Sequence, residues 1–212
     1  MDRADYIAGC KTSDDWKSLR AKLERSENKD IWETAYNEYF FERLEKRYFA
    51  PIKLLMDNST YQGEGFTIVT ICCSLIEFLE TSIQGLNYKY LKNNQKLTEF
   101  EYCSSKAIFI NFLSEREPFN KHFNKDSAKD FYENIRCGLL HEAQTKNGWR
   151  IHACSPNKKI ISEKEKIVYR NNLQDAFAKF LDLYKKELLQ NEGYQAAFIR
   201  KFDSLCNSSV LD

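Results

Sequence analysis

An arginine and a histidine five positions apart, Arg136 and His141, are the residues with the clearest chemical potential in this sequence. An imidazole titrates near neutral pH, so it can take a proton from a ribose 2′-hydroxyl or give one to a leaving oxygen. A guanidinium can form a bidentate pair with a phosphate and stabilise the charge that develops on it. Held together in a cleft, the two groups could cleave RNA.

The segment that carries this pair is predicted to be a helix. It follows Asp126 and Ser127, either of which can cap a helix, and continues without a proline to the breaker Asn147-Gly148. At about 100° per residue its apolar positions fall on one core-facing stripe. The stripe consists of Phe131, Ile135, Gly138 and Leu139, with Tyr132 and Ala143 on its flank.

The opposite face of this helix is half apolar. On an ideal helix Arg136 and His141 lie about 140° apart, and the arc between them carries Glu133, Cys137 and Leu140. A monomer gains little from exposing such an arc, so a partner surface is expected to cover it. Gly138, which costs about 1 kcal/mol relative to alanine within a helix, would then mark the close approach of another helix.

Arg136, four intervening residues and His141 near a helix end resemble the Arg, four to six residues, His motif of the HEPN superfamily. The resemblance covers about residues 30 to 190 and implies an all-helical bundle that forms a homodimer through its motif helices. Many members are metal-independent endoribonucleases, often toxins or phage-defence effectors, with an antitoxin or regulatory protein as partner. By this resemblance Arg136 binds the scissile phosphate of RNA and His141 is the catalytic residue.

One position departs from the pattern of active HEPN members. The residue after the motif arginine is usually polar, whereas this chain has Cys137, which forms weaker hydrogen bonds. An alternative is therefore an inactive HEPN-like module that binds nucleic acid, a nucleotide or a protein. Glu133 and Asn134 are candidate orienting residues on the polar side. In a purely structural reading, Arg136 pairs with a surface carboxylate and His141 ends a helix.

A basic segment follows, in which the hydrophobic period changes from helical to alternating. Trp149, Ile151 and Ala153 alternate with polar residues, and β-branched runs flank a turn at 155–157, which predicts a short β-hairpin, with three strands at most. Residues 146–170 hold seven basic and two acidic side chains. They could guide an RNA backbone, through Arg150, Lys158 and Lys159, while Trp149 stacks a base. Alternatively, the lysines protect a sheet edge.

Other chemistries have weaker support in the sequence. Cys137 and His141 could meet His152 and Cys154 around zinc, but structural zinc sites use tighter paired spacings. A Cys137 nucleophile activated by His141 lacks a visible orienting residue. Gly63-Glu64-Gly65 lacks the residues of a phosphate loop. No metal and no cofactor are expected.

The rest of the chain predicts a mainly α protein, a HEPN-like bundle of five to seven helices in a single domain. Helices are expected near residues 13–26, 29–57 with Pro51 kinking or dividing the run, 66–86, 98–113, 171–191 and 194–205. Residues 1–29 form an N-terminal helical extension, 146–170 the basic hairpin insertion, and 207–212 a frayed tail. The helix at 66–86 should be the central buried one, with Glu77 and Glu80 leaving the core or pairing with a basic residue.

Composition agrees with this class. Hydrophobic residues make up 42% of the chain, with 7 Gly and 3 Pro, and the net charge of +1 indicates no overall nucleic-acid affinity. Seven cysteines without a Cys-x-x-Cys pair, and no signal segment at the start, favour a reduced cytoplasmic protein. The longest apolar run, 66–79, is shorter than the roughly 20 residues that span a bilayer, so no membrane association is expected.

Overall fold

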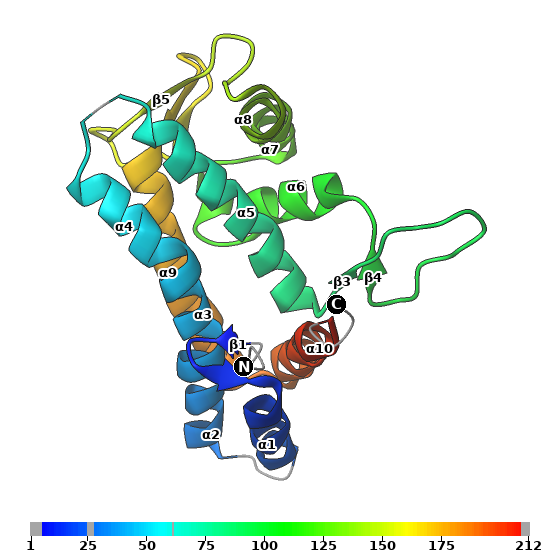
Figure 1. The fold of residues 1–212 in the computed structure, drawn as a ribbon. Coiled ribbons are helices and arrows are strands. Elements are labelled where there is room, and N and C mark those ends of the chain that lie inside the picture. Colours follow the sequence, from blue (N-terminus) through cyan, green and yellow to red (C-terminus); the bar gives the residue numbers. More distant parts are fainter. Residues whose placement is uncertain (1–5, 25–27, 61, 209–212) are drawn as a thin grey trace, which may run out of the picture. The chain divides into compact units, whose positions relative to one another are not determined.

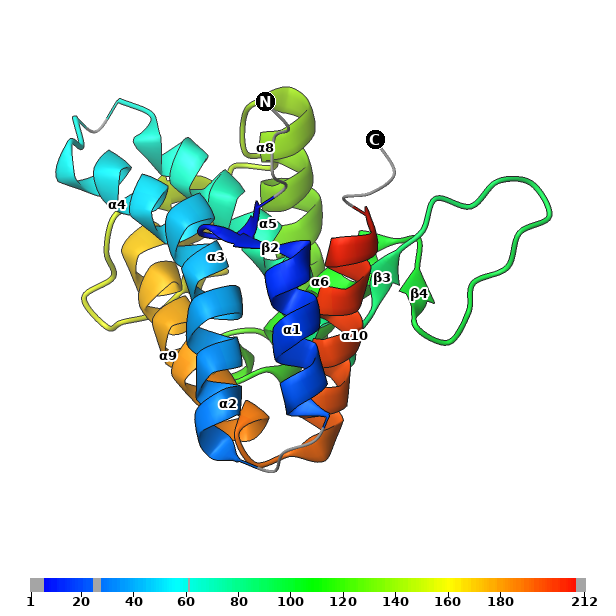
Figure 2. The same ribbon diagram turned by 60° about the horizontal axis from the view of Figure 1, so that its bottom comes forward.

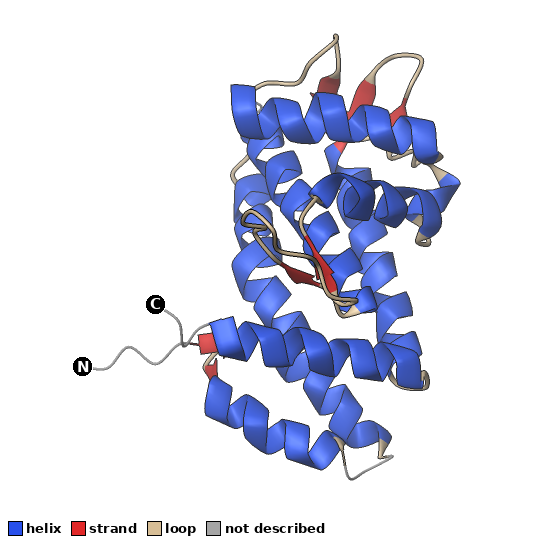
Figure 3. Cartoon of the chain, turned by 90° about the vertical axis from the view of Figure 1, so that its right-hand side faces the viewer, coloured by secondary structure: helices blue, strands red, loops and turns tan. Residues whose placement is uncertain are grey.

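The chain is mainly α-helical. A computed structural model describes residues 6–24, 28–60 and 62–208. In these ranges the protein is 65% helical, with small sheets and seven helices (Figures 1 and 3). Two of the helices, residues 29–57 and 125–142, are continuous runs that each carry several element labels. A mainly α protein of five to seven helices, predicted from the sequence, is confirmed. Backbone contacts divide the chain into two compact units. The first comprises Met1–Pro51, Thr81–Cys103 and Tyr184–Asp212, and the second Ile52–Glu80 and Ser104–Leu183.

The first unit packs its helices around an aromatic core. Its elements include β1 (Tyr6–Ala8), β2 (Lys11–Thr12), α1 (Ser13–Leu23), α2 (Lys29–Thr34), the π-helical η1 (Ala35–Phe41), α3 (Glu42–Leu44), the π-helical η2 (Glu45–Phe49), the start of α4 (Ala50–Asp57), β3 (Asn87–Tyr88), β4 (Glu101–Tyr102) and α10 (Glu192–Ser208). Trp16 on α1 and Phe202 on α10 are buried with their ring centroids 5.1 Å apart, and Figure 2 shows these two helices side by side.

Two predictions about the helices of this unit are confirmed, and one feature was missed. The helical run from residue 29 to 57 is continuous, so Pro51 does not divide it. Pro51 directly follows the π-helical η2 and Ala50, and as an interior proline it has no N–H to donate to the preceding turn. The helix after Thr12 is present as α1. The antiparallel pair β1–β2 before it was not predicted. Predictions for residues 25–27 and 209–212, at the end of the first helix and in the tail, lie outside the described residues.

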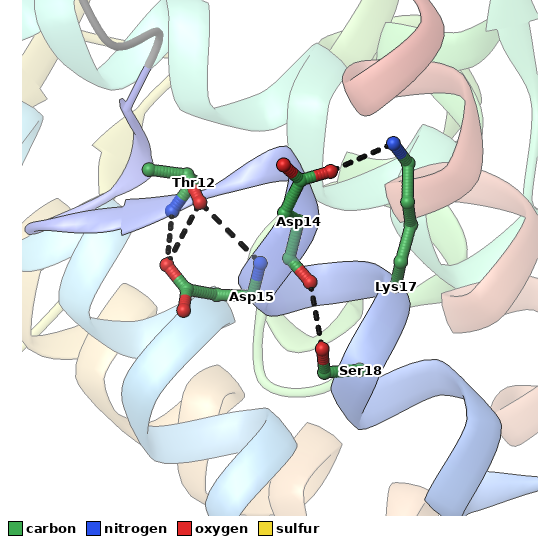
Figure 4. Close-up of polar contacts among 5 residues, drawn as sticks. All are labelled: Thr12, Asp14, Asp15, Lys17 and Ser18. Atoms are coloured by element: carbon green, nitrogen blue, oxygen red, sulfur yellow. Dashed lines mark hydrogen bonds and ion pairs between the residues drawn. The ribbon is translucent and has the colours of Figure 1, made fainter.

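A reciprocal cap starts α1 (Figure 4). The Thr12 hydroxyl accepts a hydrogen bond from the Asp15 N–H at 3.3 Å, and the Asp15 carboxylate accepts one from the Thr12 N–H at 2.8 Å. The hydrogen bonds that the Thr12 N–H and the Thr12 hydroxyl donate to the Asp15 carboxylate lower the pKa of Asp15, because they favour the charged form. The cap satisfies N–H groups that a helix start leaves without intrahelical partners.

The helix predicted from Thr98 begins later, because strand β4 occupies part of its predicted first turns. β3 (Asn87–Tyr88) and β4 (Glu101–Tyr102) pair in parallel, and α6 (Ser105–Glu115) starts only after them. The capping pattern of Thr98 and Glu101 is real, since the Glu101 carboxylate accepts from the Thr98 N–H at 2.7 Å. It closes a turn before β4, where Lys89 also pairs with Glu101 at 2.9 Å.

The second unit contains the central apolar helix and the segment around Arg136. It holds most of α5 (Glu64–Gln84), then α6, the 3₁₀ turn η3 (Phe119–Lys121), α7 (Lys125–Phe131), the π-helical η4 (Tyr132–Arg136), α8 (Cys137–Glu142) and most of α9 (Arg170–Leu188). Phe112, Phe119 and Phe177 are buried in its core. Among the described residues α5 is the one helix long and apolar enough to cross a membrane, and 61% of its apolar window is buried, as in a core helix.

The basic segment forms a three-stranded sheet, one of the two forms that its sequence allows. The strand order is β5 (Arg150–His152), β7 (Ile167–Tyr169) and β6 (Ile161–Ser162). β6 and β7 form the antiparallel hairpin, whereas β5 pairs with β7 in parallel. A parallel pairing needs a long connection between its strands, and local alternation of residues does not reveal it.

A buried ion pair explains Glu80, one of the three acidic residues of α5. Glu80 is fully buried, and its carboxylate oxygens each accept a hydrogen bond of 2.8 Å from the Arg116 guanidinium. The expectation that a basic residue neutralises this glutamate is confirmed. Because burial removes the Glu80 carboxylate from water, while Arg116 keeps some access to solvent, the carboxylate depends on this partner.

We expect Glu80→Gln to lower the free energy of unfolding by about 1–3 kcal/mol, since it replaces two charge-assisted hydrogen bonds to Arg116 by the weaker contact of a neutral amide. Urea unfolding followed by circular dichroism measures this change. Lys17→Ala is the control, because it removes an ion pair with Asp14 that is exposed to solvent (Figure 4) and should leave stability unchanged. Equal stability of Glu80→Gln and wild type would contradict the assigned role.

Candidate functional site

The candidate residues lie on one continuous helix, residues 125–142, called the motif helix, which consists of α7, η4 and α8. Its cap is Asn124, whose side chain accepts from the Ser127 N–H at 2.9 Å while the Ser127 hydroxyl accepts from the Asn124 N–H at 3.0 Å. The cap therefore lies two residues before the predicted Asp126. The helix ends at Ala143, which has a left-handed φ of 54°.

The predicted core stripe of the motif helix is confirmed. Phe131, Ile135, Gly138 and Leu139 are all buried. Phe131 packs on Phe109 of α6 at a ring-centroid distance of 6.0 Å and on Phe123 at 5.5 Å. These contacts fix the rotation of the helix and so decide which residues face outward.

Gly138 has a structural reason other than the one expected. A Cβ at this position would lie 2.5 Å from the Gln144 carbonyl oxygen and 3.2 Å from the Lys146 Cγ. The chain folds back against the motif helix directly after it ends, and the Lys146 N–H donates to the Asn134 carbonyl at 2.9 Å. The expectation that Gly138 marks a partner helix is wrong, because its own chain occupies that space.

Arg136 is half-buried and held by an aromatic ring. Its guanidinium carbon lies 5.4 Å from the centroid of the Tyr132 ring, a cation–π distance. Tyr132 is itself fixed, because its hydroxyl lies 3.1 Å from the Ser105 Oγ and its ring meets Phe109 edge-on. Within the described ranges Arg136 forms no ion pair with a carboxylate. The structure therefore gives no support to the alternative in which Arg136 only pairs with a surface carboxylate.

His141 is exposed in the last turn of α8. Its neighbour Glu142 pairs with Lys146 at 2.6 Å, and the Lys146 ammonium lowers the pKa of that carboxyl, with a smaller effect from His141. In the part of the chain that is described, no hydrogen bond joins His141 to Arg136. The two groups share a helix but do not contact each other within one chain.

The arc between Arg136 and His141 has the half-apolar character that its sequence predicts. Leu140 has 45% of its surface exposed, and Cys137 is half-buried. Cys137 also lies near Cys73 of α5, where burial raises the pKa of the Cys73 thiol to about 12 and Arg136 opposes that rise. The arc thus presents a leucine and a thiol to solvent beside the two candidate groups.

The two supporting residues have structural partners. Glu133 is exposed and pairs with Lys106 of α6 at 2.7 Å, which lowers the pKa of its carboxyl. Asn134 is buried, contrary to its predicted location on the polar side. Its amide donates to the Asp130 carboxylate at 2.5 Å and accepts from the Asn147 amide at 2.7 Å. Asn134 is therefore engaged within the fold and unsuited to orient a substrate.

Trp149 belongs to the same buried network. Its side chain is 3% exposed, and its indole N–H donates to the Asp130 carboxylate at 3.0 Å. A buried ring cannot stack a base, so that interpretation of Trp149 is corrected. The alternation of residues 149–153 places tryptophan on the inward side of the segment, and the sequence does not reveal Asp130 as its partner. The sequence offered one hint of this network: Asp130 and Asn134 are four residues apart on a predicted helix, so their side chains are neighbours.

The other three predicted RNA-binding residues are exposed. Arg150 lies on β5 and donates to the Glu165 carbonyl at 3.2 Å, while Lys158 and Lys159 lie in the loop between β5 and β6. Lys159 also contributes to a basic neighbourhood around His122. Burial, followed by the charges of Lys179, Lys121 and Lys159, lowers the pKa of His122. The candidate basic surface thus extends beyond the segment predicted from sequence.

A small cavity lies elsewhere in the second unit. Its volume is about 140 Å³, and its walls come from the first turn of α5, from β5 and from the start of α9, namely Gly63, Glu64, Gly65, Phe66, Ile151, His152, Ala153 and Arg170. Arg170 at its wall is buried and donates to the Ser59 hydroxyl at 3.2 Å. The lining includes neither Arg136 nor His141, so the cavity is a separate feature.

Metal coordination gains no geometric support. Among the described residues no group of three or more His, Cys, Asp and Glu side chains is arranged to hold a metal ion. The pairs Cys137/His141 and His152/Cys154 therefore do not assemble into the zinc site considered from the sequence.

Comparisons with known proteins add no relative: no family model, no curated protein and no solved structure matches this chain.

The packing at Gly138 predicts that Gly138→Ala lowers the free energy of unfolding by about 1–3 kcal/mol. The added methyl overlaps a backbone carbonyl, and this cost exceeds the gain in helix propensity. Chemical unfolding measures the loss. Cys137→Ala, next to it on the same helix but half-exposed, is the control and should remain close to wild type. A Gly138→Ala protein more stable than wild type would show that the chain after the helix does not pack as described.

Proposed function

We propose that this protein is a metal-independent endoribonuclease of the HEPN type, with Arg136 and His141 as its catalytic residues. The observation that carries the proposal is that Arg136 is held in position by a neighbouring ring but is not neutralised by a carboxylate among the described residues. Its guanidinium is held over the Tyr132 ring at 5.4 Å and forms no ion pair with a carboxylate among the described residues. A positioned cation without a protein anion is suited to a phosphate, and an exposed histidine follows on the same helix.

The chemistry needs no group beyond those of the chain and the RNA. The His141 imidazole accepts the proton of a ribose 2′-hydroxyl, and the freed oxygen attacks the adjacent phosphorus. The bond from phosphorus to the 5′-oxygen breaks, and that oxygen takes up a proton from a protonated histidine, which would be the His141 of a second copy, or from water. The products are a 2′,3′-cyclic phosphate and a 5′-hydroxyl. Arg136 stabilises the extra negative charge on the phosphate in the transition state.

A second copy of the chain would complete such a site. Five residues correspond to about 140° on an α-helix, so the two side chains of one motif helix diverge. Two motif helices facing each other would place an arginine and a histidine from different copies on one phosphate and would supply both a base and an acid. The exposed Leu140 supports this arrangement, because a dimer would bury it.

RNA would approach over basic side chains. Arg150, Lys158 and Lys159 are the proposed contacts to its backbone, and their charges would make binding dependent on salt. The resemblance to HEPN proteins extends the proposal to a cytoplasmic toxin or phage-defence effector that is restrained by an antitoxin or another regulatory protein.

A binding module is the second candidate function, and Cys137 favours it. This thiol occupies the position after Arg136, where a polar side chain would help to hold the phosphate, and the neighbouring Asn134 amide is engaged by Asp130 and Asn147. The chain would then bind nucleic acid, a nucleotide or a protein through the same surface without cleaving it.

Cleavage of a mixed single-stranded RNA in the presence of a chelator tests the enzyme directly. We expect the wild type to cut and His141→Ala to be slower by about 10²–10⁴-fold, the usual contribution of general acid–base catalysis. Arg136→Ala should also lose cutting, and Arg136→Lys should recover only part of it because lysine cannot pair bidentately. RNA with 2′-deoxyribose should resist.

His152→Ala is the matched control, since His152 is an exposed histidine that lies on β5 and not on the motif helix. It should cut at the wild-type rate. Cutting of 2′-deoxy RNA would exclude the proposed mechanism, and binding of RNA without cutting by the wild type would favour the binding module.

The proposed interface predicts that Leu140→Glu dissociates the dimer. A buried charge without a partner is costly, so light scattering at micromolar concentration should give the mass of one chain for the variant and of two for the wild type. Leu54→Glu, at an exposed leucine of α4, is the control and should leave the mass unchanged. Two chains in the Leu140→Glu sample would remove the motif helix from the interface.

A further inference from the structure

A long loop between β3 and β4 gathers exposed aromatic side chains. This arm, residues 87–102, extends as an open loop in Figures 1 and 2. Tyr88 is 61% exposed and Tyr90 is 73% exposed, and Leu97 and Phe100 are exposed with them. A concentration of large apolar groups on one short segment of a soluble protein usually marks a binding surface.

The base of the arm is fixed within the first unit. The Asn87 N–H donates to the Phe100 carbonyl and the Lys89 N–H to the Tyr102 carbonyl, both at 2.9 Å. The Tyr88 ring meets the Tyr102 ring edge-on at 5.6 Å. The Arg200 guanidinium covers one face of Phe100 at 4.1 Å. The chain therefore holds Tyr88 in place, and Tyr90 follows two residues later.

The charges between these rings are positive. Residues 88–97 contain three lysines and no acidic residue. The Lys89 ammonium pairs with the Glu101 carboxylate at 2.9 Å. The same carboxylate accepts a hydrogen bond from the Thr98 N–H. Lys92 and Lys96 are exposed, and in the described part of the chain neither forms an ion pair. Glu99 is the acidic residue that remains nearby. Two lysines are thus free to contact an external anion.

We propose that this arm binds single-stranded RNA, with Tyr88 and Tyr90 stacking on neighbouring bases and Lys92 and Lys96 contacting the phosphates. Alternate residues of an extended segment point to the same side, so two rings at i and i+2 can receive two bases. Exposed rings combined with lysines are the features of surfaces that bind single strands with little sequence preference. An anionic partner fits residues 88–97, because this stretch holds three lysines and no acidic residue, and single-stranded RNA supplies both the negative charges and the bases that stack on tyrosine rings.

The proposal deepens the RNA-directed function and rests on it for the identity of the polymer. It requires no cleavage, because the arm contains none of the catalytic residues. Binding can therefore be measured with His141→Ala as the parent protein, so that the RNA stays intact. A protein that does not cleave RNA and an arm that does not bind RNA are then distinguished by separate measurements.

Fluorescence anisotropy with a labelled RNA of about 12 nucleotides, a length within the range of known single-strand sites, is the experiment. In the His141→Ala parent, Tyr90→Ala should weaken binding about tenfold, and Tyr88→Ala with Tyr90→Ala about a hundredfold, given the usual contribution of one stacked base. Tyr90→Phe keeps the ring and should bind as the parent does. Lys92→Gln with Lys96→Gln should reduce the dependence of binding on salt.

Tyr6→Ala is the matched control, because Tyr6 is an exposed tyrosine on β1 outside the arm, and it should leave the affinity unchanged. Duplex RNA of the same sequence, with its bases already stacked, should bind the parent and the double tyrosine variant equally. No binding of single-stranded RNA by the parent would overturn the proposal. Parent-like binding by the double tyrosine variant would also overturn it and would assign the exposed rings to a protein partner.

Discussion

The hydrogen bonds that join Asp130 and Asn134 to Asn147 and Trp149 decide the arrangement around the motif helix. The two helical residues lie one turn apart and receive donors from the chain that leaves the helix. Asn134 and Trp149 are buried, and buried polar groups need partners, which the half-buried Asp130 and the exposed Asn147 supply. The return of the chain also occupies the space beside Gly138, which is why no larger residue fits there. The network therefore holds the helix end, the turn after it and the start of β5 in one geometry.

This constraint has a consequence for function. With one side of the motif helix packed on α6 and another covered by its own returning chain, Cys137, Leu140 and His141 stay accessible on the arc that remains. Arg136 at the edge of that arc is held by Tyr132, which α6 supports in turn. Residues that looked like candidates for binding, Asn134 and Trp149, instead maintain the geometry of the residues that remain exposed. Function in this region would be carried by a few side chains on a surface that buried polar contacts position.

Different interactions stabilise the cores of the two units. The first packs aromatic rings of α1, η1 and α10 around Trp16, and it keeps a further set of rings exposed on the arm between β3 and β4. The second combines a phenylalanine core with the ion pair of Glu80 and Arg116, where a buried charge is tolerated because two hydrogen bonds accompany it. Lysines of the basic segment remain in solvent, as their cost of desolvation requires.

The sequence by itself determined the helices, because their apolar spacing and caps are local properties. The run from 29 to 57, the buried α5 and the core stripe of the motif helix follow from the spacing of apolar residues and from the caps beside them. Tertiary structure decided the features that depend on residues distant in sequence. The parallel pairing of β5 with β7, the turn that uses Thr98 and Glu101 before β4, and the burial of Trp149 against Asp130 require partners that no local pattern specifies. The types and spacing of Arg136 and His141 were visible in the sequence, whereas the ring that holds Arg136 and the chain that fills the space at Gly138 became visible only when the helix was packed.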